Sequence, residues 1–501
     1  MRLAPVWAVV FVALALFQIT LVWTHVPWMD ELQAVLLARD SRSLSDWYWN
    51  FRYEGHPPLW HLLLKLPLML GFSPAISLKL LLTPIAVGTL ALIAFKAPFA
   101  PHWRLLLGLN YFFLFEYGAI ARPYSLGGLL LLAALAWRRH PMAWLPVALL
   151  PTCGLQFVLL TLVMGWLLWR ERSIWVPGVG LTLASILVAL IWIYPAPDFQ
   201  SSLSPGVLAT SYVESLKWAI LRAGVVLFPM DLQGGPAAWT QPVGMTTLLA
   251  AGGAMLPAWA LASLWPNRTF VLVAGAFVTA TFAISIFSFG LSARHFGLIF
   301  LLALALTWVR LQEGERLNAV FGAWIFMLGL QGAVVAATSF QHPFATTRDL
   351  AAGLQTSGET EAVFVPVGVG IGAEITAVTA RPTIDHVHSC LQTFARTRAP
   401  AYALRLRAAA GPRGDLSAEG GRVLVGDLER IAARAGGRIL ILADRPRREL
   451  IELAARPSLR VIATFADRRP GGQFDRWIYE MRVAPDPGGA PFPDCRDLIP
   501  R

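Results

Sequence analysis

Carboxylates and an imidazole near the first apolar run are the side chains whose types and spacing could do chemistry. Asp30 and Glu31 open the helical stretch LQAVLLA, and Glu54 lies two residues before His56. A carboxylate can act as a general base, and partial desolvation at a membrane boundary makes it a stronger one. Acids also occur in the first turn of helices because they complement the helix dipole. The residues alone leave both interpretations open.

Two arginines stand beside later apolar runs. Arg122 lies in the segment ARPYSL (121–126) and Arg294 in SARH (292–295). Glu116 precedes Arg122 by about a turn and a half, and acids near a membrane span are candidate functional residues. An arginine at the end of a span is also a common headgroup anchor. A pair of guanidiniums nevertheless suits a phosphate or diphosphate, which each can bind through two hydrogen bonds.

The composition indicates which elements must position these groups. Of the 501 residues, 56% are hydrophobic and only 14% are charged, against about a quarter charged in soluble proteins. Residues 1–341 hold 31 charged side chains, whereas residues 342–501 hold 40, and all 22 basic ones there are arginine. We therefore predict two domains: a transmembrane module over 1–341 and a water-soluble α/β domain over 342–501.

The apolar runs predict about 11 transmembrane helices, since ~20 apolar residues cross ~30 Å of hydrocarbon. The runs are 5–23, 75–95, 104–118, 124–137, 142–153, 155–169, 173–194, 243–264, 269–289, 294–310 and 317–338. Two Pro-bounded segments, 57–71 and 215–230, contain Lys65, Lys217 and Arg222. We expect them to be interfacial helices, with their basic side chains reaching the headgroups.

The positive-inside rule predicts the orientation of these spans. Six basic positions or loops fall on one side, which should be cytoplasmic: Arg2, 96–104, Arg138/Arg139, Arg170/Arg172, Arg268 and 310–316. The N-terminus is then cytoplasmic, whereas the first loop (24–74) and the C-terminal domain face outward. The excess of 11 positive charges thus reflects membrane topology, and we expect no nucleic-acid partner.

The C-terminal third alternates strand and helix patterns. We predict strands over 361–367, 438–443, 459–465 and 476–483 and helices over 346–355, 370–379, 424–435 and 446–455. An oxidising compartment would permit a disulfide between Cys390 and Cys495, although two thiols in one domain can equally stay free.

Three motifs in this order carry a resemblance to a known family. Asp30-Glu31 after the first span, the GHPPL segment (55–59) and ARPYSL (121–126) resemble bacterial membrane glycosyltransferases of the C-type (GT-C) fold. These are relatives of the protein O-mannosyltransferases and of the enzyme that adds aminoarabinose to lipid A. Arg294-His295 resembles an Arg-Tyr pair that often opens a late span in this group, with His in place of Tyr.

The resemblance implies an inverting glycosyltransferase that moves a sugar from a polyprenyl-phosphate donor to a lipid, glycan or protein acceptor. It would act in the bacterial cytoplasmic (inner) membrane, at the periplasmic face and among membrane lipids. Asp30 would be the general base, and Glu54 would be a second catalytic carboxylate lining the active site. Four basic residues would bind the donor phosphate: Arg122, Arg294, Lys217 and Arg222. Five residues would contact substrate: Glu31, His56, Tyr124, Glu116 and His295.

Members of the family differ in their need for a divalent metal, and Asp30, Glu31 and Glu54 would be its ligands here. The identity of the sugar and the acceptor does not follow from the sequence. A polytopic transporter or flippase is the alternative function, and an assembly component is a third. Neither accounts as well for acids and arginines gathered on one side of the membrane.

Overall fold

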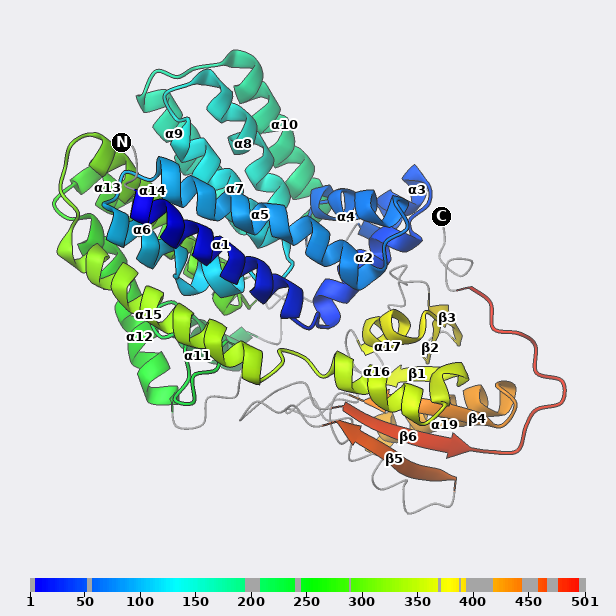
Figure 1. Ribbon diagram of the computed structural model, residues 1–501. Coiled ribbons are helices and arrows are strands. Elements are labelled where there is room, and N and C mark those ends of the chain that lie inside the picture. Colours follow the sequence, from blue (N-terminus) through cyan, green and yellow to red (C-terminus); the bar gives the residue numbers. More distant parts are fainter. Residues whose placement is uncertain are drawn as a thin grey trace.

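The structure is a computed structural model of the chain (Figure 1). It describes residues 5–51, 56–193, 208–238, 245–287, 290–367, 371–386, 389–392, 418–443, 458–465 and 476–494. The chain is a polytopic α-helical membrane protein whose C-terminal part carries a small β-sheet.

The helical part extends from α1 to α15. Its helices are α1 (Pro5–Thr24), α2 (Met29–Asp40), α3 (Leu44–Phe51), α4 (Leu59–Met69), α5 (Pro74–Lys96), α6 (Pro101–Gly108), the π-helix η1 (Phe112–Glu116), α7 (Pro123–Ala136), η2 (Pro141–Ala143), α8 (Trp144–Leu149), η3 (Leu150–Cys153), α9 (Leu155–Arg170), α10 (Val176–Ile193), α11 (Leu208–Gly224), α12 (Thr246–Leu264), α13 (Arg268–Phe287), α14 (Ala293–Gln312) and α15 (Ala319–Gln341).

Among the described residues, seven helices are long and apolar enough to cross a membrane. They are α1, α5, α10, α12, α13, α14 and α15. The other four expected crossings correspond to shorter helices: α7, α9, the η2–α8–η3 segment and the α6–η1 segment. Helix α14 lies in the centre of the bundle, since 83% of its apolar 18-residue stretch is buried inside the protein, against 17% for the corresponding stretch of α10.

The predicted span over 104–118 is broken into α6 and η1. The side-chain oxygen of Asn110 accepts a hydrogen bond from the Phe112 N–H (2.9 Å), which replaces a helical partner at the break. From α1, the Gln18 amide donates to the carbonyls of Leu114 (3.1 Å) and Gly118 (2.9 Å). These contacts hold the segment that leads from η1 to α7 against α1.

The two segments expected at the interface are helical. Helix α4 has 11 residues, too few to cross a bilayer, and α11 has 17. The expectation that Lys65 reaches the headgroups is wrong. Its Nζ donates to the carbonyls of Ala38, Arg39 and Ser41 at the C-terminal end of α2 (2.9–3.2 Å). Lys65 therefore ties α4 to α2, because those carbonyls have no partner within their own helix.

Helices α7 and α14 run side by side in the same direction, because contacts join both their starts and their ends. At their C-terminal ends Arg138 Nε donates to Gln312 (2.6 Å), and Arg138 forms an ion pair with Glu171. Nearby, Arg170 pairs with Glu313 (3.1 Å). These basic residues belong to the side predicted to be cytoplasmic. The N-terminal ends of α7 and α14, which carry Arg122 and Arg294, lie at the opposite end.

The C-terminal part has α16 (Thr347–Thr356), η4 (Glu359–Glu361), β1 (Phe364–Val367), α17 (Ile371–Thr379), β2 (Thr383–Asp385), β3 (Cys390–Gln392), α19 (Ala418–Arg434), β4 (Arg438–Ala443), β5 (Leu459–Phe465) and β6 (Arg476–Arg482). Its larger sheet has the order β1-β4-β6-β5, with β1 parallel to β4 and the other pairs antiparallel. The four predicted strands are confirmed, as are three of the helices. The fourth helix, 446–455, lies outside the described residues.

The C-terminal part packs against the helical part at α2. Helix α17 contacts α2, and the Thr347 hydroxyl donates to the Pro27 carbonyl just before α2 (3.1 Å). Within the sheet region, Arg476 and Glu374 form a buried ion pair through two 2.6 Å hydrogen bonds. Cys390 is disulfide-bonded and Cys153 is a free thiol. The expected partner, Cys495, lies outside the described residues.

Candidate functional site

Four helices begin next to one another at the end of the bundle that carries Arg122 and Arg294. Each start has a local cause: Trp28 precedes α2 in an extended conformation, Pro58 leads into α4, and Pro123 occupies the first position of α7. At α14, Ser292 accepts a hydrogen bond from the backbone while the His295 side chain returns to the Ser292 N–H. Helix starts expose unpaired N–H groups and partial positive charge, so this region favours anions.

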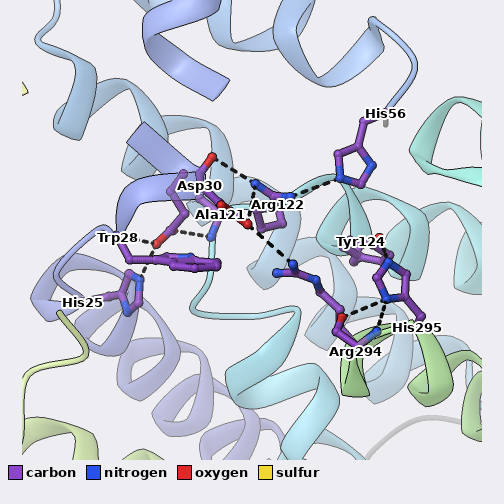
Figure 2. Close-up of polar contacts among 11 residues, drawn as sticks. His25, Trp28, Asp30, His56, Ala121, Arg122, Tyr124, Arg294 and His295 are labelled. Atoms are coloured by element: carbon purple, nitrogen blue, oxygen red, sulfur yellow. Dashed lines mark hydrogen bonds and ion pairs between the residues drawn. The ribbon is translucent and has the colours of Figure 1, made fainter. Parts of the chain in front are cut away.

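Asp30, in the first turn of α2, lies between two guanidiniums from distant helices (Figure 2). Its Oδ2 atom is 3.5 Å from Arg122 Nη1 and 3.5 Å from Arg294 Nη2. Arg122 Nη1 also donates to the Asp30 carbonyl (2.9 Å). The two arginine side chains are 11% and 13% exposed, whereas that of Asp30 is 26% exposed. The carboxylate is thus the solvent-accessible member of this triad.

Glu31 links the start of α2 to the segment that precedes α7. One of its oxygens accepts from the Ala121 N–H (2.6 Å), and the other contacts His25 Nε2 (2.9 Å) and the Trp28 N–H (3.1 Å). The Glu31 residue is fully buried. Both oxygens therefore bind protein groups, and the prediction that Glu31 contacts substrate gives way to a positioning role. It ties the start of α2 to the segment that carries Arg122.

His56 lies against Arg122 on the side away from Asp30 in Figure 2. Arg122 Nη2 is 3.1 Å from His56 Nε2, and because a guanidinium can only donate, the imidazole accepts there and carries its proton on Nδ1. Burial first, and then the charges of Arg122 and Arg294, hold the pKa of His56 well below its usual range. The ring is accordingly neutral near pH 7.

A cavity of about 170 Å³ opens beside this group. Its lining residues are Asp30, Gln33, Ala34, His56, Trp60, His61, Arg122 and Pro123. The volume is below the ~300–1,000 Å³ typical of sites for drug-sized ligands, so the cavity fits a ligand smaller than that and polar in character. Arg294 is not in its lining, which places the cavity on the Arg122 side of the triad.

Aromatic rings surround the guanidinium of Arg294. The central carbon of the guanidinium lies 5.8 Å from the ring centroids of both Trp28 and Tyr124. The Tyr117 hydroxyl donates to the backbone carbonyl of Arg294 (2.6 Å). The next residue, His295, accepts from the Ser292 N–H at Nδ1 (2.8 Å) and contacts the Tyr124 hydroxyl at Nε2 (2.6 Å). His295 and Tyr124 thus fix the start of α14 against α7.

The remaining predicted site residues lie elsewhere. Glu116 is buried in η1, where it accepts from the Tyr111 hydroxyl (2.8 Å), and it is not among the cavity residues. Lys217 is an exposed residue of α11 and pairs with Glu214 (3.4 Å). Neither residue lies at the cavity beside Asp30. We therefore assign no substrate contact to Glu116 and no contact with the donor phosphate to Lys217. Glu54 lies outside the described residues, and its catalytic role stays a prediction.

Arg222 lines a second cavity, of about 270 Å³, between α11 and α13. The Nη1 atom of Arg222 donates to the carbonyl of Leu291, which lies three residues before Arg294 (3.2 Å). It therefore adjoins the loop that leads into α14 without lining the cavity beside Asp30. A role for Arg222 in binding a phosphate stays a prediction.

The described residues do not fit a divalent metal. No group of three His, Cys, Asp or Glu side chains among them could hold one. The Asp30 carboxylate faces two guanidiniums, which would repel a cation, and both Glu31 oxygens are engaged by protein groups.

Five lining residues of the cavity were not predicted from the sequence: Gln33, Ala34, Pro123, Trp60 and His61. The last two carry polar rings. Both follow the GHPPL segment and line the cavity from the first turn of α4. Adjacent residues on a helix point about 100° apart, so no periodic pattern distinguished them from core positions. The available signal was the presence of two polar ring nitrogens at the start of an otherwise apolar helix.

Comparison with known proteins gives matches at the level of structure alone. No family model and no curated protein matches the sequence. The structure resembles ArnT from Cupriavidus metallidurans bound to undecaprenyl phosphate (TM-score 0.49, 15% identity, 95% of this chain and 98% of that chain). It also resembles arabinofuranosyltransferase AftD from Mycobacteria (TM-score 0.36, 15% identity, 98% of this chain and 40% of that chain).

Proposed function

We propose that the chain is an inverting glycosyltransferase that transfers a sugar from a polyprenyl-phosphate donor to a hydroxyl group. The single observation that carries this proposal is the position of Asp30 between Arg122 and Arg294, in the lining of a polar cavity. The GT-C resemblance of the sequence motifs around these residues points to the same reaction.

The arginines supply the site for the leaving group. A lipid-linked phosphate must be neutralised where its tail stays in hydrocarbon, and Arg122 and Arg294 lie at the ends of apolar helices. Four helix starts around them add partial positive charge. Binding of the phosphate would exchange the Asp30 carboxylate for phosphate oxygens as the partner of the guanidiniums. The carboxylate would then face the cavity.

The reaction follows as one displacement. The acceptor oxygen attacks the anomeric carbon of the sugar and forms the new glycosidic bond, while the bond from that carbon to the phosphate oxygen breaks. Asp30 takes the proton of the acceptor hydroxyl, and the departing phosphate keeps the electron pair. Arg122 and Arg294 stabilise the charge that develops on the phosphate. Such electrostatic stabilisation is usually the largest contribution to the rate.

The proposed setting is the outer face of a bacterial cytoplasmic membrane. Arg138 and Arg170 lie at the C-terminal ends of α7 and α14, where they pair with Glu171 and Glu313. These basic residues support a cytoplasmic location for that end of the bundle. The disulfide of Cys390 supports an oxidising compartment for the C-terminal part. The acceptor would be an envelope molecule such as lipid A, another glycan or a protein.

The test separates transfer from transport. Purified protein in liposomes is given undecaprenyl phosphate carrying a radiolabelled sugar, with an envelope extract as acceptor. A transferase moves the label into a product that no longer extracts with the donor lipid, and the loss requires an acceptor. If the donor stays intact and only changes leaflet, the chain is a flippase and the proposal is wrong.

A further inference from the structure

We propose that Trp60, His61 and His56 form the wall that binds the hydroxyl groups of the transferred sugar. The inference rests on the proposed function and assigns a substrate group to the cavity beside Asp30. The sugar would be uncharged, because the described lining offers one carboxylate, Asp30, and one guanidinium, Arg122, to face it.

Unsatisfied ring nitrogens are the first observation behind this wall. Within the described chain, His56 Nδ1, Trp60 Nε1 and His61 Nδ1 are buried and have no hydrogen-bond partner. All three residues line the same cavity, and so does Arg122, whose Nε is also unpartnered. A buried polar group without a partner destabilises the protein, because it has given up its hydrogen bonds to water. Several such groups around one cavity indicate a ligand that would satisfy them.

The ring positions are fixed before a ligand binds. The His61 ring stacks on Phe51, with the centroids 4.5 Å apart and the planes at 20°. Trp60 is 1% exposed and His61 is 2% exposed. His56 is held through its other nitrogen by Arg122. A wall of buried rings selects among ligands because it cannot move to suit a wrong one.

The chemistry of these groups favours sugar hydroxyls over a phosphate. The indole donates one hydrogen bond, and His56 donates from Nδ1. His61 as a neutral ring has one donor and one acceptor nitrogen. A hydroxyl can meet either kind, whereas a phosphate only accepts, so the donors alone suit both ligands and the carboxylate in the lining decides between them. Asp30, which also lines the cavity, would repel a phosphate there.

The geometry of the triad leads to the same assignment. Arg294 lies outside the cavity lining and Arg122 lies within it. A phosphate bound between the two guanidiniums would therefore have its sugar on the Arg122 side, towards α4. The anomeric carbon would then lie beside Asp30, as transfer requires.

The experiment compares the affinity of the purified full-length protein for two kinds of lipid. The first is undecaprenyl phosphate, and the second is the same lipid carrying arabinose, mannose or glucose. Trp60→Phe removes the indole N–H together with one ring of the side chain, and His61→Phe removes both ring nitrogens but keeps the stack on Phe51. Two exposed residues of the same types serve as controls away from the site: Trp137→Phe after α7 and His102→Phe in α6.

We expect the wild type to prefer one sugar-bearing lipid over undecaprenyl phosphate. Each wall variant should bind that lipid ~3–10-fold more weakly, as the loss of one hydrogen bond predicts. Affinity for undecaprenyl phosphate should stay within about twofold, because the guanidiniums are untouched. His61→Asn, which returns an amide nitrogen near the Nδ1 position, should recover part of the loss.

Three results would overturn the inference. The wild type could bind no sugar-bearing lipid better than undecaprenyl phosphate, the variants could lose affinity for both lipids equally, or they could lose affinity for neither. Equal loss would assign the wall to the phosphate or to folding. None of these results bears on transfer itself, since loss of the label from the donor in the liposome assay decides that separately.

Discussion

Asp30 Oδ2 and Arg122 Nη1 lie 3.5 Å apart although 92 residues separate them in the chain. Arg294 reaches the same carboxylate oxygen from α14, also at 3.5 Å. The three side chains come from the first turn of α2 and the starts of α7 and α14. Rigid helix ends, rather than loop tips, thus hold the proposed base against the proposed phosphate site.

The first prediction concerns the two arginines. Arg122→Ala and Arg294→Ala should each weaken donor binding and lower the turnover rate by about 10²–10³, the usual cost of losing one contact to a developing charge. The effect on the KM of the acceptor should be smaller. Steady-state kinetics with each substrate varied in turn measures both.

Lys217→Ala is the matched control, because Lys217 is exposed and paired with Glu214. We expect its donor KM to equal that of the wild type. A donor KM that rises for Lys217→Ala but not for Arg122→Ala would reassign the phosphate site to α11.

The second prediction concerns Glu31 as a positioning residue. Glu31→Gln places an amide donor opposite backbone N–H groups, so at least one buried hydrogen bond to a charged group is lost. The expected cost is about 1–3 kcal/mol of unfolding free energy, visible as a lower Tm in detergent. The turnover rate should fall as well, because Ala121 no longer anchors Arg122.

Glu313→Gln serves as the control, since Glu313 is partly exposed and pairs with Arg170 at the other end of the bundle. We expect a smaller change of Tm and wild-type turnover. If Glu31→Gln keeps both the Tm and the turnover rate of the wild type, Glu31 does not position the site.

The third prediction concerns pH and the C-terminal sheet. Burial opposes ionisation of Glu480, but hydrogen bonds from Arg482, Arg438 and Arg460 lower its pKa to about 2. A lowered folded-state pKa stabilises the fold above the ordinary value near 4.5 and loses that effect as the pH falls towards 2. The Tm of the wild type should therefore fall across this range more steeply than that of Glu480→Gln.

The control for this measurement is Asp486→Asn, an exposed acid in the same part of the chain. Its Tm should follow the wild-type curve. Parallel curves for the wild type and Glu480→Gln would show that the three arginines do not stabilise the ionised carboxylate.

The fourth prediction concerns topology. Cysteines at Ser45 in α3 and at Ala100 before α6 are exposed positions on opposite sides in the proposed orientation. The free Cys153 is buried and should not react. In intact inner-membrane spheroplasts, an impermeant maleimide should label Ser45→Cys and should label Ala100→Cys only after lysis. Labelling of both before lysis would overturn the predicted orientation.

Much of the fold follows from the sequence, because long apolar runs and strand alternation are local signals. The four strands of the larger sheet were predicted for that reason. The break at Asn110 was not, since it depends on the contact of Gln18 with the carbonyls of Leu114 and Gly118 from another helix. The hydrogen bonds of Lys65 were likewise not predicted, since they depend on α2 lying beside α4.

The candidate site was predictable where chemistry and position coincide. Asp30, Arg122 and Arg294 are rare charges at the ends of apolar runs, and His56 stands in a recognisable turn. Glu31 carries a carboxylate that could itself act as a general base, and only its three buried hydrogen bonds distinguish its role from that of Asp30. Trp60 and His61 resemble core residues until their unpartnered nitrogens are seen.

The most direct test of the central claim is the transfer rate of Asp30→Asn, measured beside Asp40→Asn near the other end of α2. Asp40 pairs with Arg39 and does not line the cavity. We predict that Asp30→Asn folds, binds the donor and transfers no sugar, while Asp40→Asn transfers at the wild-type rate. Wild-type transfer by Asp30→Asn would contradict the assignment of Asp30 as the base.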